Sequence, residues 1–128
     1  MDTLITGSQD DAGRLESGIA EKKDCTVRAY AIMKNIPYPI AHETFKLLGR
    51  KQKRGTNIHI RIYNAEFVNL KRPNMTVKTF IENYAIAGRW IIQIRGHVFA
   101  VVDKEIKDIH PMYNLNRHVK QAWMLKAK

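Results

Sequence analysis

Cysteine is almost absent from this sequence, because Cys25 is the only one in 128 residues. A single thiol cannot close an internal disulfide, and it cannot build a multi-cysteine metal site. Cys25 is therefore a buried core thiol, a surface thiol or a nucleophile. With one cysteine and no secretory signal at the N-terminus, we expect a reducing, cytoplasmic location.

Long apolar runs are also missing, and none approaches the roughly 20 residues that a membrane-spanning helix needs, so we expect no membrane partner. The chain has no Gly-x-Gly-x-x-Gly or Walker-type loop, which leaves nucleotide chemistry without support. The five histidines include no close ligand pair, and we expect neither a metal nor a cofactor. A length of 128 residues with 45% hydrophobic residues predicts one domain with a core of its own.

Acidic residues become scarce after residue 24. Residues 1–24 carry six acids and three bases, a net charge of −3, whereas the rest carry nineteen bases and six acids, a net charge of +13. We interpret residues 1–21 as a flexible acidic lead-in and residues 22–128 as a single domain. A body this basic attracts nucleic acid or an acidic protein partner.

The run Arg50-Lys51-Gln52-Lys53-Arg54 concentrates this basic charge. It is either a solvated surface loop or a phosphate-binding loop, and the sequence leaves both interpretations open. The residues that we single out for polyanion binding are Arg50, Lys51, Lys53, Arg54, Lys71 and Arg72, aided by Arg117, Lys120, Lys126 and Lys128 in the tail. No aromatic residues are interleaved for base stacking, and we expect Trp90 and Trp123 in the core or lining a groove.

Helices are predicted in the first half of the domain. Apolar spacing indicates a helix over Cys25–Lys34, with Asp24 as its N-cap and a proline after its end. A second helix is expected over Pro39–Leu48, terminated by Gly49. The segment Ile58–Tyr63 alternates apolar and polar residues, which predicts a strand or an extended segment.

Strands dominate the second half. After a short helix from its Thr76 N-cap through Tyr84, we expect strands over Arg89–Arg95, His97–Val102 and Glu105–Ile109, with a turn at Asp103-Lys104. The tail, Asn114–Lys128, is expected to form a final helix. This order predicts an α+β fold in which N-terminal helices pack on a small antiparallel β-sheet.

Cys25 falls in the first turn of a predicted helix. Free backbone N–H groups and the helix dipole favour a thiolate at that position. The neighbouring carboxylate of Asp24 opposes the thiolate unless its charge is used in capping. The sequence therefore favours, without proving, a nucleophilic Cys25.

A base and an orienting acid can be assigned on the predicted strands. His97 opens a strongly apolar strand directly after a glycine, and its pKa range suits a general base. With a turn at Asp103-Lys104, Phe99 faces Asp108, which places His97 and Asp108 diagonally on one sheet face. The order Cys25, His97, Asp108 is that of a cysteine-nucleophile triad. The alternative is a core thiol, a histidine bonded to backbone and a strand-end acid.

Several segments in this order resemble a known type of protein. The chain is similar, over roughly residues 22–110, to small phage-encoded proteins of papain-like cysteine-peptidase type. The resemblance implies a papain-like α+β fold with Cys25 as nucleophile, His97 as base and Asp108 as orienting acid, acting in a host cytoplasm. The segments that carry it are Asp24-Cys25-Thr26-Val27-Arg28-Ala29, Gly49-Arg50-Lys51 with Gly55-Thr56-Asn57, Thr76-Val77-Lys78-Thr79-Phe80, Gly88-Arg89-Trp90-Ile91-Ile92 and Gly96-His97-Val98 through Asp108.

The sequence departs from the wider papain pattern at one functional position. That pattern has a glutamine a few residues before the cysteine as an oxyanion-hole donor, and residues 19–23 contain none. The backbone N–H of Cys25 can supply one donor, and Lys23, Gln93 and Asn57 are candidates for the second.

The leading hypothesis is a cofactor-free thiol hydrolase that cleaves an amide, isopeptide or thioester bond of a protein or peptide through an acyl–Cys25 intermediate. The alternative is a catalytically inactive papain-like phage protein whose basic surface binds nucleic acid or an acidic host protein complex. A third reading is a basic component of a virion. The sequence does not determine the oligomeric state.

Overall fold

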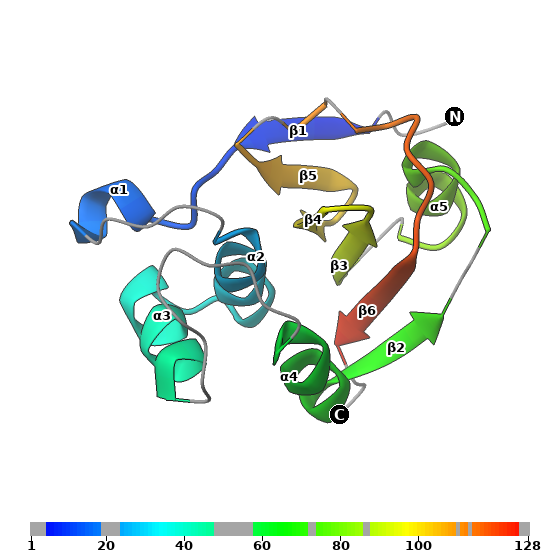
Figure 1. The fold of residues 1–128 in the computed structure, drawn as a ribbon. Helices are drawn as coiled ribbons and strands as arrows, with labels where there is room; N and C mark the ends of the chain where they lie inside the picture. The colour runs from blue at the N-terminus through cyan, green and yellow to red at the C-terminus, as the bar shows by residue number, and fades with distance from the viewer. Residues whose placement is uncertain are drawn as a thin grey trace.

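The computed structural model describes residues 5–18, 24–47, 58–71, 74–85, 88–109, 111–112 and 114–125. Within these residues, six strands form one sheet in the order β1-β5-β4-β3-β6-β2 (Figure 1). The α+β class is confirmed, but the sheet is mixed, because β1 pairs with β5 in parallel. The strands are β1 (Thr6–Gln9), β2 (Phe67–Lys71), β3 (Arg89–Ile94), β4 (His97–Val102), β5 (Glu105–Asp108) and β6 (Gln121–Leu125).

Helices cover both faces of this sheet. The helices of the described residues are α1 (Arg14–Ser17), which contacts α3, and α2 (Cys25–Lys34), α3 (Tyr38–Leu47), α4 (Ile58–Glu66) and α5 (Val77–Asn83). Successive residues of a strand point to opposite faces: Ile91 packs in one core cluster with residues of α2, α3 and α4, and Ile92 packs in the other with residues of α5. Figure 1 shows the same division, with α5 apart from the other helices. No helix among the described residues is both long enough and apolar enough to cross a membrane.

The predicted helix at residues 25–34 is the centre of the larger cluster. Val27, Ala29 and Met33 of α2 are buried against the sheet and the neighbouring helices. The helix ends at Lys34, and its C-cap Asn35, two residues before Pro37, adopts a left-handed conformation (φ 55°) that suits an asparagine. Trp123, which is fully buried, donates its indole N–H to Asn64 Oδ1 at 2.8 Å. The expected core placement of Trp90 and Trp123 is confirmed, since they are 8% and 0% exposed.

The hairpin β4–β5 has the register expected from the sequence. Val101 pairs with Ile106 and Ala100 with Lys107. Asp103 and Lys104 in the turn have φ angles of 48° and 70°, the two positive values that a type I′ hairpin turn requires. The Thr76 cap is also confirmed, because its side chain accepts from the Thr79 N–H at 3.3 Å.

Two secondary-structure predictions are wrong. Residues 58–66 form helix α4, not a strand, because His59, Ile62 and Tyr63 bury one helical face. In the tail, Gln121–Leu125 forms strand β6, not a helix. β6 lies between β3 and β2 and pairs with both, so its backbone groups are satisfied by distant segments that local propensity does not reveal.

Part of the expected acidic lead-in belongs to the sheet. Thr6–Gln9 forms the edge strand β1 beside β5. Gly7 packs so closely on Pro111 that a Cβ at this position would lie 2.6 Å from the proline Cβ. The flexibility of residues 1–21 as a whole remains a prediction, but the sheet begins before residue 22.

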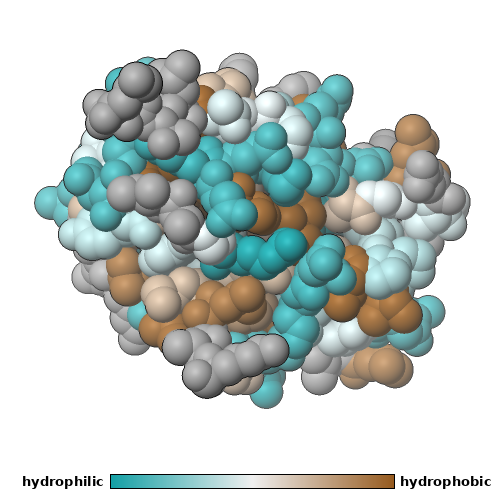
Figure 2. Space-filling view, turned by 180° about the vertical axis from the view of Figure 1, so that it is seen from behind, coloured by the Kyte–Doolittle hydropathy of each residue, from teal (hydrophilic) through white to brown (hydrophobic). Residues whose placement is uncertain are grey.

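The surface seen from behind in Figure 2 is mostly hydrophilic, with hydrophobic residues in separate patches. The most exposed large apolar side chains described are Leu15 in α1 and Leu47 in α3. Apolar side chains scattered in this way are normal for a folded protein.

Candidate active site

The first residue of α2 is Cys25, whose side chain is partly buried. The His97 side chain and the backbone N–H of Val98, at the start of β4, lie close enough to the Cys25 sulfur to lower its pKa as hydrogen-bond donors. The helix that carries the thiol packs directly on β4. The structure therefore brings Cys25 and His97 together from segments more than 70 residues apart in the sequence.

His97 is bound on its other side by Asp108. His97 Nε2 lies 2.6 Å from Asp108 Oδ2, which leaves Nδ1 as the ring nitrogen that faces the thiol. The imidazole also stacks on Phe99, with ring centroids 5.9 Å apart. The Asp108 carboxylate is itself fixed, because its Oδ1 accepts the Ile109 N–H at 2.8 Å. The three side chains proposed from the sequence thus lie next to one another, Cys25 beside His97 and His97 bonded to Asp108.

Asp24 has a different role from the one predicted. It occupies the N-cap position of α2, but its side chain makes no capping hydrogen bond. Instead its buried carboxylate accepts from Arg28 Nε at 2.9 Å and from the Tyr38 hydroxyl at 2.8 Å. The charge that was expected to oppose the Cys25 thiolate is therefore paired with a guanidinium.

Arg28 connects the two acids of the site. Its Nη1 lies 3.3 Å from Asp108 Oδ1, while its Nε binds Asp24. Arg28 is 8% exposed, so these ion pairs form in a largely dry environment. Sequence reasoning did not select Arg28 or Tyr38. The Asp24–Arg28 spacing of four residues was a readable signal for an ion pair along the helix.

The electrostatics of the site favour a thiolate–imidazolium pair. Burial alone would raise the pKa of Cys25, but the His97 and Val98 hydrogen bonds and the positive charges of His97 and Arg28 bring it below the ordinary value. Burial alone would lower the pKa of His97, but its bonds to Asp108 and Cys25 raise that pKa to about 9.

The pKa of Asp108 is shifted in the complementary direction. Burial opposes its ionisation, but the His97 bond, the Ile109 N–H and the Arg28 charge hold the pKa below the ordinary value. Asp108 therefore stays ionised when His97 is protonated. The pKa values of Cys25 and Asp108 are lowered and that of His97 is raised, and each of these shifts favours the charged form.

One of the three candidates for the second oxyanion donor can be examined. Gln93 pairs with Val98 across the β3–β4 hairpin, close to the start of β4. Its Oε1 accepts from Gln121 at 2.9 Å and lies 3.4 Å from His59 Nε2. Within the described part of the chain, no contact uses the Gln93 amide nitrogen as a donor. Lys23 and Asn57 lie outside the described residues.

The candidate polyanion-binding residues lie mostly where the structure gives no description. Arg50, Lys51, Lys53, Arg54 and Arg72 are outside the described residues. Lys71 ends strand β2, which is an edge strand of the sheet. The phosphate-binding interpretation of the basic loop thus stays a prediction. No group of three or more His, Cys, Asp or Glu side chains arranged to hold a metal occurs among the residues that the structure describes.

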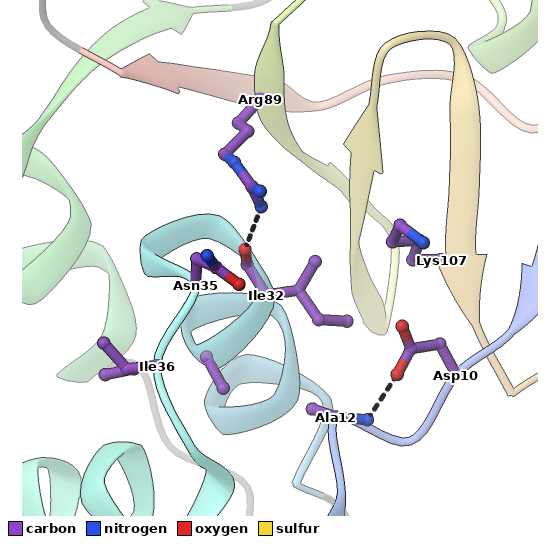
Figure 3. A pocket seen from close by; sticks show the side chains of 8 residues that line it. Asp10, Ala12, Ile32, Asn35, Ile36, Arg89 and Lys107 are labelled. Atoms are coloured by element: carbon purple, nitrogen blue, oxygen red, sulfur yellow. Dashed lines mark hydrogen bonds between the residues drawn. The ribbon is translucent and has the colours of Figure 1, made fainter.

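A pocket of about 330 Å³ lies at the opposite end of α2 from Cys25 (Figure 3). Its polar side chains already have partners: Arg89 donates to the Ile32 carbonyl at 2.7 Å, and Asp10 accepts the Ala12 N–H at 2.7 Å. Lys107 points toward the same space and lies 2.8 Å from Glu105 Oε1. None of Cys25, His97 and Asp108 lines this pocket.

A second pocket, of about 390 Å³, borders His97 and Asp108. Arg28, Arg95 and Arg117 contribute to its lining. Arg117 was among the tail bases singled out from the sequence, and Arg95 was not. The closeness of Arg95 and Arg117 arises because the segment before β6 returns beside the β3–β4 turn.

A scan against protein-family models gives no match, and searches of curated proteins and of solved structures give no significant match. The chemistry of the site must therefore be inferred from its own atoms.

Proposed function

We propose that this protein is a thiol hydrolase of papain-like type that cleaves an amide, isopeptide or thioester bond of a protein or peptide. The observation that carries the proposal is the continuous contact from Cys25 through His97 to Asp108, with the His97–Asp108 bond at 2.6 Å. A nucleophile, a base and a group that orients the base are the minimum set for this reaction.

The residues act in a defined order in the proposed reaction. The Cys25 thiolate attacks the substrate carbonyl carbon, forming a C–S bond while the π electrons move to the oxygen. As the carbonyl re-forms, the bond to the leaving group breaks, and that group takes the proton held by His97. Water then attacks the acyl carbon and gives its proton to His97, and the C–S bond breaks to release a carboxylic acid and the thiolate.

Asp108 and Arg28 position the base in this scheme. Asp108 holds Nε2 of His97, so that Nδ1 stays directed at the sulfur and at the leaving group. Arg28 holds Asp108 from the other side and keeps the Asp24 charge paired. The Cys25 backbone N–H is the oxyanion donor that we assign, and Gln93, which pairs with Val98 across the hairpin, is the candidate for the second.

The papain-like assignment is supported by the way the fold divides the site. The nucleophile begins a helix, and the base and the orienting acid lie on the sheet against which that helix packs. The further assignments to a phage protein and to a host cytoplasm rest on the sequence resemblance. A buried structural thiol is the alternative for Cys25, and its partial exposure argues against it.

The test is the alkylation rate of Cys25 by iodoacetamide at pH 7, followed by intact mass. With only one cysteine, every added label reports this residue. We expect labelling of the folded protein at least about tenfold faster than of a free thiol, since a lowered pKa increases the thiolate fraction. His97→Gln should slow it, and the matched control His42→Gln should not. Labelling only after denaturation contradicts the proposal.

Turnover is tested by mixing the protein with p-nitrophenyl acetate. We expect a burst of p-nitrophenolate with acetyl addition that is lost in Cys25→Ser. A rapidly alkylated Cys25 with no acetyl addition would favour the second candidate, a non-catalytic protein that binds nucleic acid or an acidic host complex. The charge of +10 is the observation behind that candidate. Its signature is duplex binding that weakens steeply with salt.

A further inference from the structure

The pocket beside His97 is rich in positive charge. Its lining includes the guanidinium groups of Arg28, Arg95 and Arg117 and a single carboxylate, Asp108. His97 also borders it and carries a positive charge at neutral pH, because its pKa is raised to about 9. The net charge of the lining is therefore positive.

Arg95 and Arg117 supply the charge that a ligand can use. Arg28 is already held between Asp24 and Asp108. By contrast, neither Arg95 nor Arg117 forms an ion pair with a carboxylate within the described part of the chain. Both residues are exposed, so the pocket presents two guanidinium groups to solvent.

The two arginines have a fixed relation to each other. Arg117 Nη2 donates to the backbone carbonyl of Arg95 at 3.2 Å. This bond holds the Arg117 guanidinium against the β3–β4 turn, directly before His97 in the sequence. Asn114 lines the same pocket and adds an uncharged amide to it. A guanidinium held in this way loses less side-chain freedom when it binds a ligand.

Asp108 is the one lining group that opposes an anion, and its charge is compensated. It contacts His97 at 2.6 Å and Arg28 at 3.3 Å. Both partners are cationic at neutral pH. The repulsion that Asp108 exerts on a bound anion is therefore balanced within the site.

The pocket lies on the side of the site where the leaving group of the substrate is expected. The pocket borders His97 and Asp108 but not Cys25. In the proposed reaction, His97 must give its proton to the leaving group, so the leaving group lies on the His97 side of the scissile bond. The acyl group stays on the sulfur.

We propose that the pocket lined by Arg95 and Arg117 binds a carboxylate on the leaving-group side of the substrate, either an acidic side chain or a C-terminal carboxylate. The inference rests on the proposed function for its orientation, while binding of the anion itself does not require catalysis. The planar guanidinium groups match the two oxygens of a carboxylate. The substrate class is therefore an acidic peptide or protein.

Binding is tested by isothermal titration of the Cys25→Ser protein with glutarate and with its uncharged analogue glutaramide at low salt. We expect glutarate to bind and glutaramide to bind at least about tenfold more weakly, because only the first can pair with a guanidinium. Arg117→Gln and Arg95→Gln should each weaken glutarate binding roughly two- to fivefold, the upper range for an exposed ion pair. The matched control is Arg61→Gln on the exposed side of α4, which should leave binding unchanged.

Because the titration uses the serine variant, it separates this inference from the proposed function. Glutarate binding that both pocket variants weaken supports the inference even if the wild-type thiol proves unreactive. Equal binding of the two probes, or glutarate binding that Arg95→Gln and Arg117→Gln leave unchanged, overturns it even if Cys25 reacts rapidly. Inorganic phosphate is titrated in parallel. Tighter binding of phosphate than of glutarate would overturn the assignment of a carboxylate.

Discussion

The ionisation of Cys25 depends on the negative charge of Asp108, which acts through His97. The variant Asp108→Asn tests this dependence. Asparagine keeps the size of the side chain but removes the carboxylate that holds His97 Nε2 at 2.6 Å. The pKa of His97 is raised to about 9 in the intact site, with Asp108 as the first of the groups that raise it. Without that charge, the burial of the imidazole favours its neutral form.

The size of the effect follows from the titration of His97. A histidine with a pKa of about 9 is about 97% protonated at pH 7.5. A histidine whose pKa has returned to its ordinary value of ~6.5 is about 9% protonated at that pH. The imidazolium that stabilises the thiolate therefore becomes about tenfold scarcer, and the pKa of Cys25 rises toward its ordinary value.

The assay is the iodoacetamide rate of Cys25 from pH 5 to 10. We expect Asp108→Asn to react about tenfold more slowly than wild type near pH 7.5, and the two rates to converge near pH 10, where the thiol ionises without help. Convergence also shows that the sulfur remains accessible in the variant. Glu82→Gln, an exposed carboxylate of α5, serves as the control. An acid limb at the same pH in Asp108→Asn and wild type would refute the coupling through His97.

Three further predictions concern stability. Phe45 is fully buried and packs edge-on against Tyr30. Phe45→Ala should therefore lower the free energy of unfolding, measured by urea titration, by about 3–5 kcal/mol. A loss below about 1 kcal/mol would contradict this packing. Tyr38→Phe leaves the buried Asp24 carboxylate without its hydroxyl donor and should cost about 1–3 kcal/mol, checked in the same way. In Cys25→Ser, Asp108 still raises the pKa of His97, although Cys25 no longer contributes. The resulting stabilisation is complete below pH ~6.5 and should be lost as the pH rises through that raised pKa, a loss below about 3 kcal/mol that Cys25→Ser with His97→Gln should not show.

Local chemistry in the sequence was sufficient for several elements. The turn at Asp103-Lys104 fixed the register of β4 and β5, because a two-residue loop leaves one way to pair the strands. That register placed His97 and Asp108 on a shared diagonal, and their side chains are in contact. The helix over Cys25–Lys34 and the Thr76 cap were likewise readable from short patterns.

Other elements depended on partners that are distant in the sequence. Residues 58–63 have the alternation of a strand, but burial of His59, Ile62 and Tyr63 in the core selects a helix. Gln121–Leu125 becomes a strand because β2 and β3 leave a place between them. Such choices are set by tertiary packing, which outweighs the small differences in local propensity.

The sequence by itself determined that the one thiol would begin a helix, that a histidine and an aspartate would share a hairpin, and that the body would be basic. Only the tertiary structure decided what surrounds them. It paired Asp24 with Arg28 and Tyr38, linked Arg28 to Asp108, and brought Arg95 and Arg117 together beside His97. These contacts join segments up to 80 residues apart, and their energies depend on distance and burial, which are properties of the folded chain.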